Sequence, residues 1–217
     1  MVLDYKIVYE GGCGKFVEKK SQFIATVFPI NSEDETLQLI EQTRKKYWDA
    51  KHNCYAYVLG LNNEIQRCSD DGEPSGTAGK PILDVLLGER IHNALIIVTR
   101  YFGGTLLGTG GLVRAYSKAA QDGLDNSVIV EKCLGKKIRI VTDYNGIGKL
   151  QYIVGQMSLV TIDTLYGENV DAYILAPFDQ VDSFIAKVVE ASAGRAEIEI
   201  LDELYYAQKE NDIILFT

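Results

Sequence analysis

The chain has 217 residues, of which 47% are hydrophobic, and a formal net charge of −8. This length supports a sizeable core in one large or two smaller domains, and the acidic balance argues against a broad basic face for nucleic acid. The apolar runs are short and the first twenty residues carry many charges. We therefore expect no membrane-spanning helix, no signal peptide and a cytoplasmic protein.

The distribution of charge and the cysteine and histidine contents limit the kinds of functional site that the chain can contain. Residues 1–135 hold 15 basic against 17 acidic side chains, whereas residues 136–217 hold 7 against 13. The C-terminal part is therefore the acidic one. The four cysteines form no CxxC pair, which indicates reduced thiols rather than a zinc ribbon or a redox pair. We expect no metal and no cofactor. Of the two histidines, His52 is the stronger candidate for a functional residue.

The first predicted elements are strands and one helix. Residues 5–9 and 21–28 are typical of strands, separated by turn-like glycines at 11, 12 and 14. Ser32, with Glu35 three residues later, predicts a capping box at the start of a helix. Residues 55–59 and 64–68 then predict a hairpin joined by residues 60–63.

The loop at residues 69–79 interrupts all periodicity. It places Asp70, Asp71 and Glu73 within four residues, and Pro81 then begins a short helix through Leu87. Neighbouring carboxylates suit a hard cation or acid–base work, although the spacing is not that of an EF-hand. A solvated loop that starts a helix is the favoured interpretation over a metal site.

The most specific segment is residues 93–116. Residues 93–99 predict a strand buried on both faces, and glycines 108, 110 and 111 lead into a helix over about 111–123. A glycine-rich helix start exposes backbone N–H groups and suits an anion. Dinucleotide-binding and Walker motifs both fail here, at Val113 and Pro81 respectively. Anion binding and close glycine packing therefore remain equal alternatives.

The remainder predicts a second domain after a junction at residues 135–137, giving domains 1–134 and 135–217. A strand over 138–142 precedes a helix marked by Ile147 and Met157, and residues 159–166 and 170–176 predict a hairpin. A second helix, marked by Val181 and Val189, and a last strand over 197–205 complete the order. The order βαββαβ is ferredoxin-like, a pattern that hosts many unrelated functions.

Several motifs of the first 130 residues resemble the YigZ/IMPACT family. They include residues 100–104, which read RYFGG, residues 70–74, which read DDGEP, and residues 114–116, which read RAY. The resemblance implies an α+β chain. Its N-terminal domain would have the left-handed βαβ arrangement of a ribosomal-protein domain 2, elongation factor G domain IV and GHMP kinases, followed by a ferredoxin-like domain. Eukaryotic relatives are translation regulators that work through protein partners.

Three functions follow as hypotheses. The first is a translation-associated regulator that binds RNA, the ribosome or a translation factor. The second is a hydrolase or transferase that handles phosphate in a cleft of Asp, Glu, His and Arg side chains. The third is a scaffold for protein partners with an acidic C-terminal sheet.

Whether the protein is an enzyme stays open, because no nucleophile or nucleotide motif is complete. The candidate site residues are Lys51, His52, Cys54, Asp70, Asp71, Glu73, Lys80, Arg100, Tyr101, Gly103, Gly104, Gly108, Gly110, Gly111 and Arg114. We expect them to line one open recess.

Overall fold

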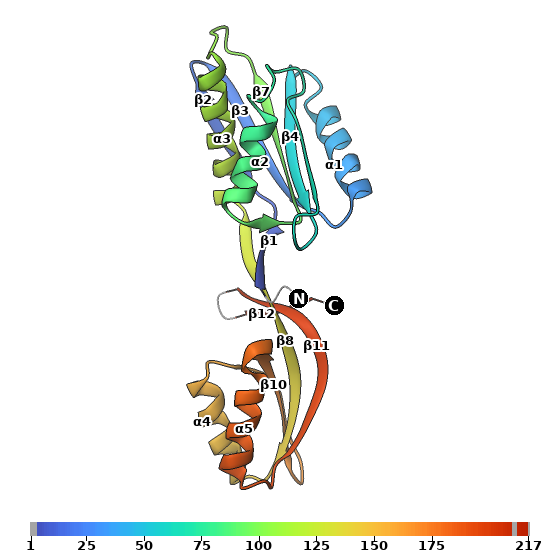
Figure 1. Cartoon of the computed structure of the whole chain (residues 1–217), viewed down its shortest axis with the longest axis vertical. Coiled ribbons are helices and arrows are strands. Elements are labelled where there is room, and N and C mark those ends of the chain that lie inside the picture. Colours follow the sequence, from blue (N-terminus) through green and yellow to red (C-terminus); the bar gives the residue numbers. More distant parts are fainter. Residues whose placement is uncertain (1–3, 210–211, 217) are drawn as a thin grey trace. The chain divides into compact units, whose positions relative to one another are not determined.

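The computed structural model describes residues 4–209 and 212–216. The chain divides into an N-terminal unit, Tyr5–Glu131, and a C-terminal unit that starts at Lys132 and also includes Asp4. Figure 1 shows both units with most of their elements labelled. Of the helices in residues 4–209 and 212–216, none is both long and apolar enough to cross a membrane.

A five-stranded sheet forms the centre of the N-terminal unit. Its strands, in spatial order, are β2 (Cys13–Glu18), β3 (Ser21–Pro29), β7 (Ala94–Tyr101), β4 (His52–Leu59) and β5 (Ile65–Ser69). Both β3 and β4 pair antiparallel with β7 between them, so they run parallel to each other. Helix α1 (Glu33–Lys46) connects them and makes the βαβ crossover that the predicted fold requires.

Helices cover both faces of this sheet (Figure 1). Helix α1 packs through Ile40 on one face, whereas α2 (Gly79–Gly88) and α3 (Thr109–Asp125) pack together on the other. Because the central strand β7 lies between the two layers, residues 94–100 are all buried, as the apolar run predicted. A short parallel pair, β1 (Asp4–Glu10) with β6 (Ile91–His92), completes the unit.

The predicted capping box at α1 forms with one change of partner. Ser32 is the N-cap, and its Oγ accepts the Glu35 N–H at 3.2 Å. In a standard capping box the Glu35 carboxylate would accept the N–H of the N-cap residue, Ser32. Here it accepts the N–H of the preceding residue, Asn31, at 2.8 Å. Both otherwise unpaired backbone donors at the helix entrance are therefore satisfied.

The glycines at 11, 12 and 14 do not mark one long turn, because the sequence from Cys13 onward forms β2. The reason for glycine here is close packing. A Cβ on Gly14 would lie 2.6 Å from the Gly123 nitrogen of α3, so only a glycine lets helix and strand approach this closely.

The C-terminal unit has the predicted ferredoxin-like order. Its elements are β8 (Val128–Thr142), α4 (Gly146–Gln156), β9 (Val160–Tyr166), β10 (Val170–Pro177), a 3-10 turn (Phe178–Gln180), α5 (Val181–Ser192) and β11 (Glu197–Lys209). The antiparallel sheet has the order β11-β8-β10-β9, and α4 and α5 pack on it around Phe184. This confirms the predicted fold class, α+β with a ferredoxin-like second domain. An additional strand that was not predicted, β12 (Asp212–Phe216), pairs with β11.

The predicted junction at residues 135–137 falls within β8, which is continuous from Val128 to Thr142. Gly135 lies within the strand because a Cβ there would be 2.7 Å from the Tyr206 ring. The glycine therefore accommodates a neighbouring aromatic side chain and does not mark a linker.

Candidate functional site

The loop between β5 and α2 is organised around the carboxylate of Asp70. This carboxylate accepts backbone N–H groups from Gly76, Ala78 and Gly79 at 2.8, 3.0 and 2.9 Å. Burial raises the pKa of Asp70, but the three N–H donors outweigh burial and leave the pKa below its ordinary value. Asp70 therefore holds the loop and the start of α2 together.

Asp71 fastens the same loop to neighbouring elements. Its carboxylate accepts the Asn53 backbone N–H at 2.7 Å and pairs with Arg44 of α1 at 2.9 Å. Its carbonyl oxygen lies 2.8 Å from Nδ1 of His52. Both aspartates are thus used within the fold, whereas Arg100 pairs with Glu73.

Glu73 is the buried partner of Arg100. Its Oε1 lies 2.5 Å from Arg100 Nη1, and the two side chains are only 4% and 6% exposed. The same oxygen accepts the Tyr116 hydroxyl at 2.9 Å, and Nε2 of His52 lies 3.8 Å from it. One carboxylate oxygen therefore joins β4, β7, α3 and the acidic loop.

Arg100 is further held by Ser21 and by aromatic rings. Its Nη2 donates to Ser21 Oγ at 3.4 Å, and its guanidinium lies 5.4 and 5.6 Å from the ring centres of Phe23 and Phe102. Its Nε is buried and has no hydrogen-bond partner among the residues that the structure describes. One donor of the guanidinium, the Nε–H group, is therefore left without an acceptor among the described residues.

This network forms one wall of a pocket of about 440 Å³. The pocket is lined by Lys51, His52, Gly72, Glu73, Pro74, Arg100, Phe102, Leu106, Leu107, Gly108, Thr109 and Leu112. Gly108 is the N-cap of α3 and has φ of +71°, a conformation that favours glycine. Cationic side chains thus face the amino end of a long helix, and leucines with Phe102 supply an apolar wall.

The predicted residues are brought together only in part. Five of them line the pocket: Lys51, His52, Glu73, Arg100 and Gly108. Cys54 is buried beneath it, where its thiol donates to the Asp70 carbonyl and lies 3.3 Å from the Tyr116 hydroxyl. Burial raises the pKa of the Cys54 thiol, so this cysteine is not an activated nucleophile.

The other predicted residues lie outside the pocket lining. Lys80 pairs with Asp84 on the surface of α2, and the Tyr101 hydroxyl donates to Asp49 at 2.8 Å. Arg114 lines a neighbouring hollow, and neither Arg114 nor Tyr101 is among the residues that line the pocket. The remaining glycines, Gly103, Gly104, Gly110 and Gly111, belong to the turn after β7 and the first turn of α3.

Sequence reasoning missed the roles of Tyr116, Ser21 and Phe102. Tyr116 is one of the buried residues of α3, and the sequence around it gives no separate signal for its hydroxyl. A tyrosine on a buried helix face needs a hydrogen-bond partner, which is the signal that points to Glu73.

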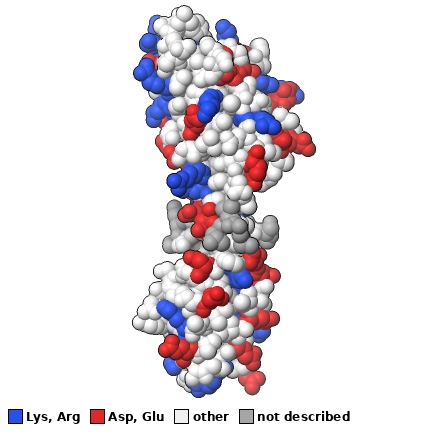
Figure 2. Space-filling model, viewed as in Figure 1, with Lys and Arg blue, Asp and Glu red and all other residues white. Residues whose placement is uncertain are grey.

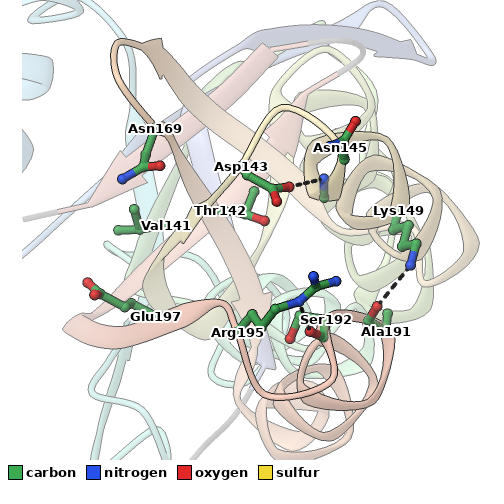
Figure 3. Close-up of a pocket in the computed structure, with 11 residues that line it drawn as sticks. Val141, Thr142, Asp143, Asn145, Lys149, Asn169, Ala191, Ser192, Arg195 and Glu197 are labelled. Carbon is green, nitrogen blue, oxygen red and sulfur yellow. Dashed lines mark hydrogen bonds between the residues drawn. The ribbon is translucent and has the colours of Figure 1, made fainter.

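The C-terminal unit contains a second, smaller cavity of about 210 Å³ at the start of α4 (Figure 3). Several of its polar groups bind one another. Lys149 donates to the Ala191 carbonyl at 3.3 Å, Arg195 to the Ser192 carbonyl at 3.1 Å, and the Gly146 N–H to Asp143 at 2.6 Å. These donors therefore serve the ends of α4 and α5.

No group of three or more His, Cys, Asp and Glu side chains suits a metal ion within residues 4–209 and 212–216. The three carboxylates of the acidic loop point to different partners: backbone N–H groups for Asp70, Arg44 for Asp71 and Arg100 for Glu73. A shared cation site at this loop therefore has no geometric basis.

Comparisons with known proteins agree with the motifs. Residues 19–124 match the Impact N-terminal domain, and residues 140–195 match a domain of unknown function (DUF1949). The IMPACT family member YigZ of Escherichia coli (strain K12) is 33% identical over 85% of this chain and 92% of its own. The IMPACT family member YvyE of Bacillus subtilis (strain 168) is 37% identical over 96% of both chains.

One solved structure is similar in fold along most of this chain. A crystal structure titled as that of a hypothetical protein is 29% identical, with a TM-score of 0.59, and covers 93% of this chain and 99% of its own. The two-domain translational regulator Yih1 gives a TM-score of 0.39 at 21% identity, too low to carry an argument. With relatives this similar along nearly the whole of both chains, the protein belongs to the IMPACT family.

Proposed function

We propose that this protein is a cytoplasmic, translation-associated regulator that binds RNA, with the pocket of the N-terminal unit holding a phosphate group. The observation that carries the proposal is the meeting of Lys51, His52 and Arg100 with the amino end of α3 in one pocket. The role in translation that the resemblance to the YigZ/IMPACT family implies gives the anion its biological setting.

Charge and geometry both favour an anion over a cation. Glu73 accepts the Arg100 and Tyr116 donors through Oε1, so the charge of its carboxylate is already balanced by Arg100. Lys51 is exposed and forms no ion pair within the described part of the chain. The backbone N–H groups of the first turn of α3 lack intrahelical acceptors and favour a negative group.

A hydrolase or transferase is the weaker candidate for the same pocket. Cys54 is the thiol nearest the network, and burial keeps it protonated. Glu73 would have to leave its buried ion pair to act as a base. Binding of a phosphate group therefore explains the arrangement more simply than catalysis, because it requires neither a deprotonated Cys54 nor a Glu73 that has left its ion pair.

The test is the affinity of the whole chain for a fluorescently labelled single-stranded RNA, measured by anisotropy at several salt concentrations. We expect Lys51→Gln to weaken binding several-fold and to lower the salt slope by about 0.7, the value for one lost phosphate contact. Lys45→Gln is the matched control, because Lys45 is an exposed cation of α1 on the other face of the sheet.

Equal affinity of the two variants, or no RNA binding by the unmodified chain, would contradict the proposal. Recovery of ribosomal or factor proteins with the chain after nuclease treatment would instead favour a protein partner. In that case the acidic C-terminal unit becomes the surface to test next.

A further inference from the structure

The turn between β2 and β3 carries two lysines in an unusual conformation. Glu18 pairs with Ser21, so Lys19 and Lys20 are the two central residues of a tight hairpin. Their φ angles are +44° and +67°, the pattern of a type I′ turn, which strongly favours Asn and Gly. Non-glycine residues with positive φ point to a local function when the surroundings enforce them.

These lysines stand beside other cations. A hollow of about 400 Å³ is lined by Phe16, Glu18, Lys19, Leu107, Gly111, Arg114, Ala115 and Lys118. Lys118 pairs with Asp122 at 2.7 Å, whereas Lys19, Lys20 and Arg114 form no ion pair with any described residue. Figure 2 shows Lys and Arg gathered along the edge of the N-terminal unit where β2 and α3 lie.

The hollow and the phosphate pocket are neighbours. Leu107 lines both of them. The Ser21 hydroxyl, directly after Lys20, accepts the Gly103 N–H at 3.1 Å and an Arg100 donor at 3.4 Å. A Cβ on Gly103 would overlap the backbone of Lys20, so the lysine turn is packed against the turn after β7. The lysine turn is therefore anchored next to the pocket, and the hollow that contains Lys19 and Arg114 adjoins the pocket at Leu107.

We propose that Lys19, Lys20 and Arg114 contact successive phosphates of a single-stranded RNA. One nucleotide of the same strand occupies the pocket that Lys51 and Arg100 line. This inference rests on the proposed function and extends it from one phosphate to a strand. The backbone at these two lysines forms the tip of a hairpin that is itself anchored, so the points from which their side chains extend are set before binding.

The apolar groups beside this track favour a single strand over a duplex. Phe102 is 48% exposed and Leu106 is 83% exposed, and both line the pocket. An exposed aromatic ring next to a cationic track suits an unstacked base, which a duplex does not offer.

The experiment replaces Lys19 and Lys20 together with Asn and Gly, the residues that the turn prefers. We expect the K19N/K20G variant to melt at a higher temperature than the unmodified chain and yet bind a labelled 12-nucleotide RNA roughly tenfold more weakly, with a salt slope lower by about 1.4. The K19R/K20R variant keeps both charges and should retain the affinity. A loss of binding with a gain in stability excludes unfolding as the cause.

Three outcomes would overturn the inference: unchanged RNA affinity in K19N/K20G, tighter binding of a duplex of the same length, or equal binding of a polyglutamate peptide. If Lys51→Gln weakens RNA binding while K19N/K20G does not, the phosphate pocket stands and the extended track fails. If the unmodified chain binds no RNA, the proposed function fails and this inference with it.

Discussion

Replacing Glu73 with Gln tests the buried network directly. The substitution keeps the size of the side chain and one oxygen able to accept the Tyr116 hydroxyl. It removes the negative charge that lies 2.5 Å from Arg100 Nη1. Arg100 then remains buried with a positive charge that nothing compensates.

The expected cost follows from the burial of both groups. Removing one partner of a buried ion pair typically costs 3–5 kcal/mol, since the remaining charge is left desolvated and unpaired. Glutamine retains a hydrogen bond to the guanidinium, so we expect the lower value, about 3 kcal/mol. For a unit of this length such a loss lowers the melting temperature by about 10 °C.

Urea unfolding followed by circular dichroism measures this loss, with Glu33→Gln as the matched control. Glu33 also accepts a tyrosine hydroxyl, that of Tyr57, but it is solvent-exposed. A cost below about 0.5 kcal/mol for Glu73→Gln would refute the assigned role of the ion pair. So would a Glu73→Leu, Arg100→Met double variant that loses the full sum of the two single losses.

Three further predictions concern the surroundings of the pocket. Because folding lowers the pKa of Asp70, its contribution to stability is present above its ordinary value of 3.8 and is lost as the pH falls through the lowered value. Urea unfolding at neutral and acidic pH should therefore show a smaller acid loss in Asp70→Asn. A thiol reagent should label the exposed Cys13 in the native protein and Cys54 only after unfolding, as mass spectrometry of labelled peptides would report. Gly103→Ala should destabilise the fold by about 1–3 kcal/mol in thermal unfolding, because its Cβ meets the backbone of Lys20.

Much of the fold was predictable because its signals are local. Ser32 and Glu35 predict the start of α1 from four adjacent residues, and both make the capping bonds. The βαββαβ order follows because stretches with strand-like spacing of hydrophobic residues alternate with stretches of helix-like spacing along the C-terminal sequence. Gly14 and Gly135 misled the prediction, since close packing against α3 and Tyr206 explains them and neither contact is visible in the sequence.

The partners within the site were not predictable, because they depend on backbone turns and on strand register. Asp71 and Gly72 have φ of +42° and +86°, which redirects the chain so that Glu73 points to Arg100 while Asp71 points to Arg44. His52 meets Arg100 because β4 and β7 pair in the register that places these two residues opposite each other. A shift of one residue would move His52 to the other face of the sheet.

The balance between Glu73 and Arg100 links the stability of the pocket to its affinity for anions. In the unmodified chain Glu73 neutralises Arg100, so Lys51 and the amino end of α3 carry the attraction. In Glu73→Gln the freed charge of Arg100 makes a bound anion the replacement partner. Inorganic phosphate should therefore raise the melting temperature of the variant more than that of the unmodified chain, since a ligand stabilises the state it binds. Equal shifts would mean that the anion does not reach Arg100, and the phosphate would then have to be held by Lys51 and the amino end of α3 alone.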